Sequence, residues 1–220
     1  MTAVEVHCFG LDPGEAETAR LAGLLDEGER AHAARFRFDR DRRRFLVRRG
    51  RLREVLGRAT GVAPARLAFT TGSHGKPALP DGPCFSLSHS GERMMLVLAD
   101  RAVGCDIERI DDAVEWAPLA ERLFAAGERR ALAALPEADG RRGFFECWAR
   151  KEAFVKALGL GLSYPLEAFE VAVGPEARLL AGGAGWAIAA AAPGTGFTGA
   201  VVALDDGGAL EISFEAWETA

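Results

Sequence analysis

Hydrophobic residues follow two different spacings along the chain. Apolar residues at alternate positions, or in short continuous runs such as residues 94–99, predict strands over residues 3–9, 85–91, 94–99, 102–110, 168–173, 185–191, 198–204 and 209–214. Apolar residues at helical spacing predict helices over residues 15–36, interrupted near Gly28, and over residues 39–61, 118–135 and 144–159. The third of these helical regions contains a break near Gly127. The order of the segments predicts an α+β protein.

Glycine and proline mark the turns between these segments. Residues 67–70 begin a series of short strands, and residues 72–77 form a turn that places Lys76 on a loop or at a strand entry. Residues 159–165 form a turn after the last helix. The Asp-Asp-Gly-Gly run at 205–208 predicts a hairpin between the last two strands.

The helix over residues 144–159 carries charges beside its apolar side. Winding it at about 100° per residue puts Glu152 between Trp148 and Phe145, with Lys156 one turn further along the same edge. Lys151 lies between two apolar clusters. A carboxylate among aromatic rings costs several kcal/mol, or takes up a proton, unless it is paired or bound to a cation. The polar side of the helix holds Glu146, Arg150 and Ala157.

These charges have two interpretations. Glu152 and Lys156 could form an i,i+4 ion pair on a solvated face, worth ~0.3–0.5 kcal/mol. That interpretation leaves Lys151 unexplained, and a solubilising pair would more naturally lie on the side held by Glu146 and Arg150. The pattern therefore favours a functional role.

An arginine-rich helix is predicted over residues 39–61, with Asp39 as its N-cap. Ten of the 27 basic residues are arginines at positions 35 to 53, and Arg44, Arg48 and Arg51 share one face. Such a face is often solvated, but like charges repel one another and arginine forks match phosphate oxygens. Nucleic acid is disfavoured by the net charge of −5 and by the lack of stacking aromatics or a known binding motif. The segment therefore predicts another anionic partner.

Ser88 and His89 lie at the end of the strand predicted over residues 85–91. A lone histidine is more often structural, but the run Ser-His-Ser-Gly offers hydroxyls, an imidazole and backbone donors to an oxyanion.

Asp106 and Glu108 share one face of the strand predicted over residues 102–110, opposite the apolar face. An Asp-x-Glu pair is common as solvated surface. With a third carboxylate, for which Glu152 is the candidate, it would instead form an open octahedral magnesium site.

Composition sets the general class of the protein. A chain of 220 residues with 49% hydrophobic content can bury one large core or those of two small halves. The four cysteines show neither a disulfide framework nor zinc spacing, which fits a reducing cytoplasm. The N-terminus shows no secretory leader, and the apolar stretch at 184–192 is too short to span a bilayer. We therefore expect a soluble protein with no membrane partner.

The motifs together resemble one enzyme family. Gly104-Cys105-Asp106-Ile107-Glu108 precedes Trp148-Ala149-Arg150-Lys151-Glu152-Ala153-Phe154-Val155-Lys156, and Ser88-His89-Ser90 and Gly75-Lys76-Pro77 lie upstream. In order and spacing they resemble the 4'-phosphopantetheinyl transferases over residues 35–165. The length is similar to the monomeric surfactin type rather than the short, trimeric holo-acyl-carrier-protein synthase type. Cys105 departs from the branched aliphatic residue usual in the family, and Ala149 departs from the usual serine or threonine.

The resemblance implies a fold of two pseudo-two-fold-related halves, each a small antiparallel sheet packed on a long helix. The halves would comprise residues 1–102 and 103–220, with coenzyme A in the cleft between them. It also implies a cytoplasmic, monomeric, magnesium-dependent enzyme. Such an enzyme transfers the 4'-phosphopantetheine arm of coenzyme A to a serine of an apo acyl- or peptidyl-carrier protein and releases adenosine 3',5'-bisphosphate.

The resemblance also implies roles for individual residues. The magnesium ligands would be Asp106, Glu108 and Glu152. Glu152 would also deprotonate the acceptor serine, directly or through a metal-bound water, with Glu128 as the second candidate for this base. The expected contacts to coenzyme A are Lys156 at the pyrophosphate, Ser88, His89 and Lys151 beside the phosphates, and Arg44 and Lys76 at the adenosine phosphates. Lys156 and His89 would stabilise the leaving phosphate, and contacts from Arg35, Arg37 and Arg40 stay open.

Two rival functions use the same residues. A magnesium-dependent hydrolase of nucleotide pyrophosphates would activate water instead of a serine and would consume coenzyme A with no acceptor present. A coenzyme A or nucleic-acid binding module, in which the carboxylates are structural, would bind its ligand equally well in the presence of a chelator.

Overall fold

The computed structural model describes residues 2–72, 74–205 and 210–214, and it contains two main sheets. The first has the order β11-β1-β5-β4, built from Leu210–Phe214, Thr2–Gly10, Arg93–Ala99 and Cys84–Ser90. The second has the order β6-β10-β9, built from Val103–Arg109, Phe197–Leu204 and Trp186–Ala191. Two small ladders pair β2 (Thr70–Thr71) with β3 (Pro77–Ala78) and β7 (Glu170–Val171) with β8 (Leu179–Ala181).

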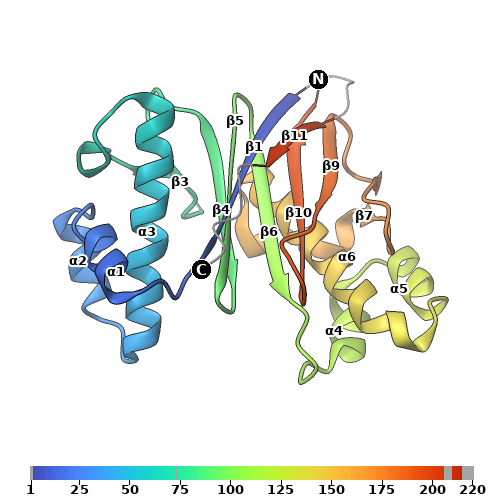
Figure 1. Cartoon of the computed structure of the whole chain (residues 1–220). Helices are drawn as coiled ribbons and strands as arrows, with labels where there is room; N and C mark the ends of the chain where they lie inside the picture. The colour runs from blue at the N-terminus through green and yellow to red at the C-terminus, as the bar shows by residue number, and fades with distance from the viewer. Residues whose placement is uncertain (1, 73, 206–209, 215–220) are drawn as a thin grey trace.

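The two sheets lie face to face between two long helices, which gives four layers (Figure 1). Helix α3 (Asp39–Thr60) packs Leu52 and Leu56 against Leu96 of the first sheet. Helix α6 (Glu137–Leu158) packs against the second sheet. The inner faces meet in a third apolar cluster that includes Val97 and Cys105. The predicted α+β class, with a small sheet on a long helix in each half, is confirmed.

The long helices end as their sequences predict. Gly61 and Gly159 follow α3 and α6 with φ of +70° and +71°, a left-handed conformation that suits glycine at a helix end. The start of α3 differs from the prediction because Phe38 is the N-cap. Asp39 lies in the first turn, where its carboxylate binds Arg42 and Arg43.

The bounds and breaks of the other predicted helices differ from those in the structure. The region 15–36 forms α1 (Glu15–Ala22) and α2 (Glu27–Ala33), and its break precedes Asp26, which caps α2, so Gly28 lies inside a helix. The region 118–135 forms α4 (Trp116–Leu123) and α5 (Ala126–Ala133), so its break precedes Gly127. Helix α6 begins at Glu137, earlier than predicted. No helix in the described ranges is long and apolar enough to cross a bilayer.

Two predicted strands are mostly irregular. Residues 67–70 contribute only Thr70 to β2, after the 3₁₀ turn Pro64–Arg66. Residues 168–173 contribute only β7, after the 3₁₀ turn Leu166–Ala168. Another 3₁₀ turn, Gly161–Ser163, follows α6.

The last strand does not pair as predicted. Of the proposed hairpin connection at 205–208, residues 206–208 lie outside the described residues. Strand β11 pairs in parallel with β1 of the first half, with Val4 opposite Ile212, and not with β10. Strand β10 already has β6 and β9 as neighbours, so it has no free edge for β11. Residues 210–214 thus complete the sheet of the first half, which is therefore not purely antiparallel.

Candidate functional site

The two sheets meet at their edge strands, β4 and β6, through serine side chains. The two-residue period of β4 turns Ser86, Ser88 and Ser90 to the same side. The Ser86 hydroxyl accepts from the Cys105 backbone amide at 3.1 Å. The Ser88 and Ser90 hydroxyls donate to the carboxylates of Asp106 at 2.7 Å and Glu108 at 2.8 Å. The junction therefore brings together groups that are distant in the sequence.

Helix α6 closes the junction because it lies very close to β6. A Cβ at Gly104 would lie 2.1 Å from the Ala153 carbonyl oxygen, so only glycine permits this approach. Lys156 Nζ donates to Asp106 Oδ1 at 2.5 Å and to Ser88 Oγ at 2.9 Å. The site thus combines residues of β4, β6 and α6.

Two buried carboxylate oxygens of the site lack partners. Asp106 is 2% exposed and Glu152 is 9% exposed, and Asp106 Oδ2 and Glu152 Oε1 have no hydrogen-bond partner among the described residues. Among the described residues, Lys156 forms an ion pair with Asp106 and not with Glu152. The i,i+4 ion pair between Glu152 and Lys156, considered as an alternative from the sequence, is therefore not formed.

Burial raises the pKa of all three carboxyl groups, and the charge of Asp106 adds to the rise for Glu108 and Glu152. Burial raises the pKa of Asp106 although Lys156 opposes the shift. Burial, followed by the charge of Asp106, raises the pKa of Glu152 and brings the pKa of Glu108 to about 7. Carboxylates destabilised in this way gain from a bound cation.

The three carboxylates do not form a finished ligand set. No group of three or more His, Cys, Asp or Glu side chains in the described ranges is arranged to hold a metal ion. Glu108 accepts from the Ser90 hydroxyl at 2.8 Å and from Trp148 Nε1 at 3.2 Å. The orphaned oxygens of Asp106 and Glu152 fit a cation, and Glu108 lies beside them on β6.

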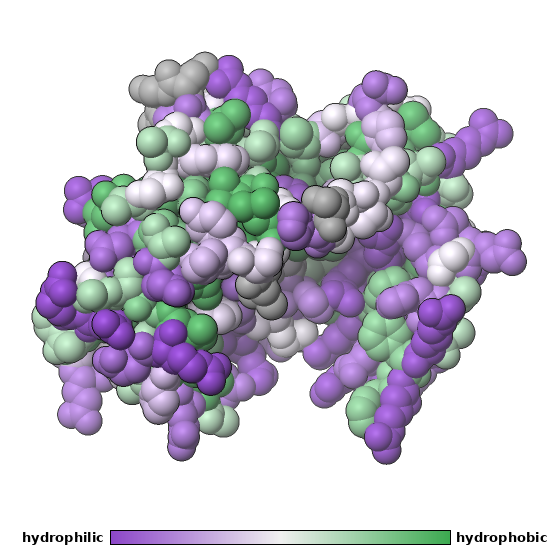
Figure 2. Space-filling model, turned by 180° about the vertical axis from the view of Figure 1, so that it is seen from behind, coloured by the Kyte–Doolittle hydropathy of each residue, from purple (hydrophilic) through white to green (hydrophobic). Residues whose placement is uncertain are grey.

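A pocket of ≈ 280 Å³ lies next to Lys156. It is lined by the loop around Lys76, by β4 and by the end of α6. Lys76 Nζ donates to the carbonyl oxygens of Val103 at 2.8 Å and Lys156 at 2.7 Å. Seen from behind, the surface is hollowed between the two halves, and hydrophilic side chains gather in the hollow (Figure 2).

Arginines of α3 border the junction. Arg44 donates to the Gly91 carbonyl oxygen at 2.8 Å and binds Asp12. Arg48 Nη1 contacts His89 Nε2, and its buried Nε has no partner within the described ranges. Burial and then the charge of Arg48 lower the pKa of His89 to about 4, although the residue is exposed.

The arginines predicted to share one face of α3 therefore do not all border the site. Arg51 binds Glu17 and Glu54 instead of facing the site. Arg37 lies over the Phe38 ring at 5.3 Å and Arg40 pairs with Asp41, on the surface before and at the start of α3. Arg35 is also exposed there. The sequence places Arg48 on this face together with Arg44, but the family resemblance assigns it no contact to coenzyme A.

The structure does not bring Lys151 and Glu128 to the site. Both side chains are fully buried and form a salt bridge of 2.5 Å. Lys151 also donates to the Phe169 carbonyl oxygen at 2.9 Å, and Glu128 accepts from the Val171 amide at 2.8 Å. These contacts anchor α5 and the residues at β7 to α6.

Arg150 also differs from its predicted place on a polar helix side. The residue is 2% exposed and donates to the carbonyl oxygens of Ala172 at 2.7 Å and Gly174 at 2.6 Å. Ala157, assigned to the same side, is buried. The segment after the helix covers this side, and helical periodicity alone does not reveal such a cover.

Comparisons with known proteins agree on one family. Residues 102–201 match the model of the 4'-phosphopantetheinyl transferase superfamily, and residues 11–101 match a 4'-phosphopantetheinyl transferase N-terminal model. The 4'-phosphopantetheinyl transferase HetI of Nostoc sp. is 38% identical over 78% of this chain and 75% of its own. The transferase psf-1 of Bacillus pumilus is 36% identical over 76% and 73%, and Sfp of Bacillus subtilis is 31% identical over 71% and 70%.

Proposed function

Because the chain belongs to the 4'-phosphopantetheinyl transferase superfamily, we propose that it transfers the 4'-phosphopantetheine arm of coenzyme A to a serine hydroxyl of an apo carrier protein and releases adenosine 3',5'-bisphosphate. The observation that carries this proposal is the junction of β4, β6 and α6. There Lys156 and two buried carboxylates adjoin the cations Arg48 and Lys76. A pyrophosphate substrate requires such charge-neutralising groups.

Magnesium suits the three carboxylates because it prefers hard oxygen ligands. We expect Asp106 and Glu152 to hold it through the oxygens that lack partners, with Glu108 as the third ligand. When bound, the cation would neutralise negative charge on the pyrophosphate.

In the proposed transfer, the serine oxygen bonds to the phosphorus that carries the pantetheine arm. The bond from that phosphorus to the oxygen of adenosine 3',5'-bisphosphate breaks. The serine proton passes to the carboxylate of Glu152, which lies beside Asp106 at the junction. Lys156 stabilises charge on the leaving phosphate, and His89, neutral at pH 7, supplies a hydrogen bond.

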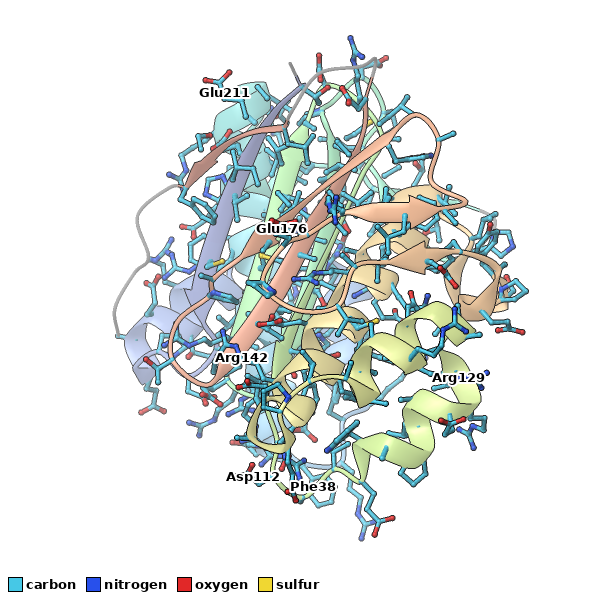
Figure 3. All side chains as sticks on the ribbon, turned by 90° about the vertical axis from the view of Figure 1, so that its right-hand side faces the viewer. Phe38, Asp112, Arg129, Arg142, Glu176 and Glu211 are labelled. Carbon is cyan, nitrogen blue, oxygen red and sulfur yellow. The ribbon has the colours of Figure 1, made fainter. Side chains whose placement is uncertain are left out.

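The carrier protein would approach the end of the molecule where β4 and β6 finish. Phe38 of the first half and Asp112 of the second lie at the same end of the molecule (Figure 3). Phe38 is 59% exposed, and Ser90 and Glu108 lie near the ends of their strands. Because one chain supplies both walls of the cleft, we propose that a monomer is sufficient.

The test follows adenosine 3',5'-bisphosphate by chromatography, with coenzyme A, magnesium and several apo carrier proteins. We expect release that requires both carrier and magnesium and that stops in EDTA. Consumption of coenzyme A without a carrier would instead support a hydrolase. Binding of coenzyme A that is unchanged by EDTA, without product on any carrier, would support a binding module.

A further inference from the structure

Lys156 reaches a buried carboxylate from the edge of the cleft. Its side chain is 31% exposed, whereas the Asp106 side chain is 3% exposed. Asp106 is fixed in β6 between β4 and β10, with Ala200 as its partner in the ladder. The lysine stem, in contrast, has four rotatable carbons and can carry its ammonium group to another anion. Of the two partners, Lys156 is therefore the one that can move.

The ammonium group of Lys156 is bonded to Asp106, the carboxylate that a cation would need as a ligand. Among the described residues, the Asp106 carboxylate forms its ion pair with Lys156. The unpartnered Asp106 Oδ2 belongs to the same carboxylate that accepts from Lys156 through Oδ1. A divalent cation bound to Asp106 would thus lie within a few ångströms of the ammonium group, and like charges at that separation repel strongly when they are half-buried.

Resting on the function proposed above, we propose that Lys156 and the divalent cation compete for Asp106, so that the cation binds tightly only when the pyrophosphate of coenzyme A has become the new partner of Lys156. Lys156 then has two successive partners, Asp106 and the pyrophosphate. Coenzyme A and the cation consequently strengthen each other's binding through this lysine, in addition to any direct contact between them.

The test measures Mn²⁺ binding by electron paramagnetic resonance at pH 8 without coenzyme A, and repeats the measurement on the parent protein with coenzyme A. Lys156→Met removes the competing charge and keeps the apolar stem, and Lys156→Gln keeps a hydrogen-bond donor. We expect both variants to bind Mn²⁺ at least tenfold more tightly than the parent protein, although their transfer activity falls. Arg109→Gln is the matched control, because it removes an exposed charge beside Glu108 that pairs with Asp111, and its Mn²⁺ affinity should stay unchanged.

The outcomes separate this inference from the proposed function. Lys156 variants that fold, by circular dichroism, and bind Mn²⁺ no more tightly than the parent overturn the competition, whereas the transfer reaction can still stand. Mn²⁺ binding that is absent in the parent with coenzyme A present overturns the metal assignment itself. A gain in affinity that Arg109→Gln reproduces would show general electrostatics and would also overturn the specific role of Lys156.

Discussion

At the scale of single residues, neighbouring lysines of α6 have different roles because their partners differ. Lys151 meets Glu128 in an interior that supplies hydrogen-bond partners to both groups. Lys156 meets Asp106 in a cleft where the carboxylate keeps one oxygen without a partner. Helical spacing identified both lysines as charges in need of partners. It could not name those partners, because they come from α5 and β6.

We expect the buried ion pair of Lys151 and Glu128 to contribute to stability rather than to the transfer reaction. Glu128→Gln leaves the Lys151 ammonium buried without its counter-charge, so urea unfolding should show a destabilisation of about 3–5 kcal/mol. The double variant with Lys151→Met should recover part of that loss, and the folded fraction of each should transfer at nearly the parental rate. A Glu128→Gln protein with parental stability and no transfer would make Glu128 the base instead.

Glu108 depends on the donors that orient it. Trp148→Phe keeps the aromatic packing and removes the indole N–H donated to Glu108, so the magnesium concentration at half-maximal rate should rise about tenfold. Trp116→Phe is the matched control, since Trp116 also packs with its ring centre 6.2 Å from that of Phe144. A magnesium requirement that is equal in the two variants would contradict a role for Trp148 in positioning Glu108.

His89 should make stability depend on pH. Its folded pKa of about 4 lies below the ordinary 6.5, so the unfolded chain takes up this proton first. The contribution of His89 to stability is complete above pH 6.5 and is lost as the pH falls toward 4. Melting temperatures of the parent should therefore decline more steeply over this range than those of His89→Gln. Parallel curves would show that the folded pKa is not lowered.

At the scale of secondary structure, the sequence predicted those features that depend on local signals. The long helices end at Gly61 and Gly159 as predicted, and the alternation in β4 and β6 and the apolar run in β5 predicted the correct strands. Strand β11 was predicted as a strand but with the wrong neighbour, because pairing depends on which sheet edges the folded chain leaves free. The serine contacts between β4 and β6 were missed for the same reason.

The close packing of α6 on β6 makes Gly104 a sensitive position. Gly104→Ala would put a Cβ 2.1 Å from the Ala153 carbonyl oxygen and 2.3 Å from the Ala157 nitrogen. The helix must move away, so we expect a destabilisation of at least about 1–3 kcal/mol and a loss of transfer as Glu152 and Lys156 shift relative to Asp106. Gly14→Ala meets no atom within 4 Å and should leave stability and transfer unchanged. Parental transfer by Gly104→Ala would show that this contact does not align the site.

At the scale of the whole molecule, the site is assembled by the meeting of two similar halves. Each half offers an edge strand, β4 or β6, and each contributes one long helix that borders the cleft. The arrangement explains why the motifs of the site are spread from Lys76 to Lys156. The family resemblance predicted the two halves and the cleft, whereas the crossing of β11 into the first half left no readable signal in the sequence.

The most direct measurement of the central claim is the intact mass of apo carrier proteins after incubation with coenzyme A, magnesium and either the parent protein or Asp106→Asn. The substitution keeps the shape of a buried side chain at the centre of the junction and removes its charge. We predict that the parent adds one phosphopantetheine arm to at least one carrier. The folded variant should add none within the time needed for complete modification by the parent. Full modification by the variant would contradict the assignment of this junction as the active site.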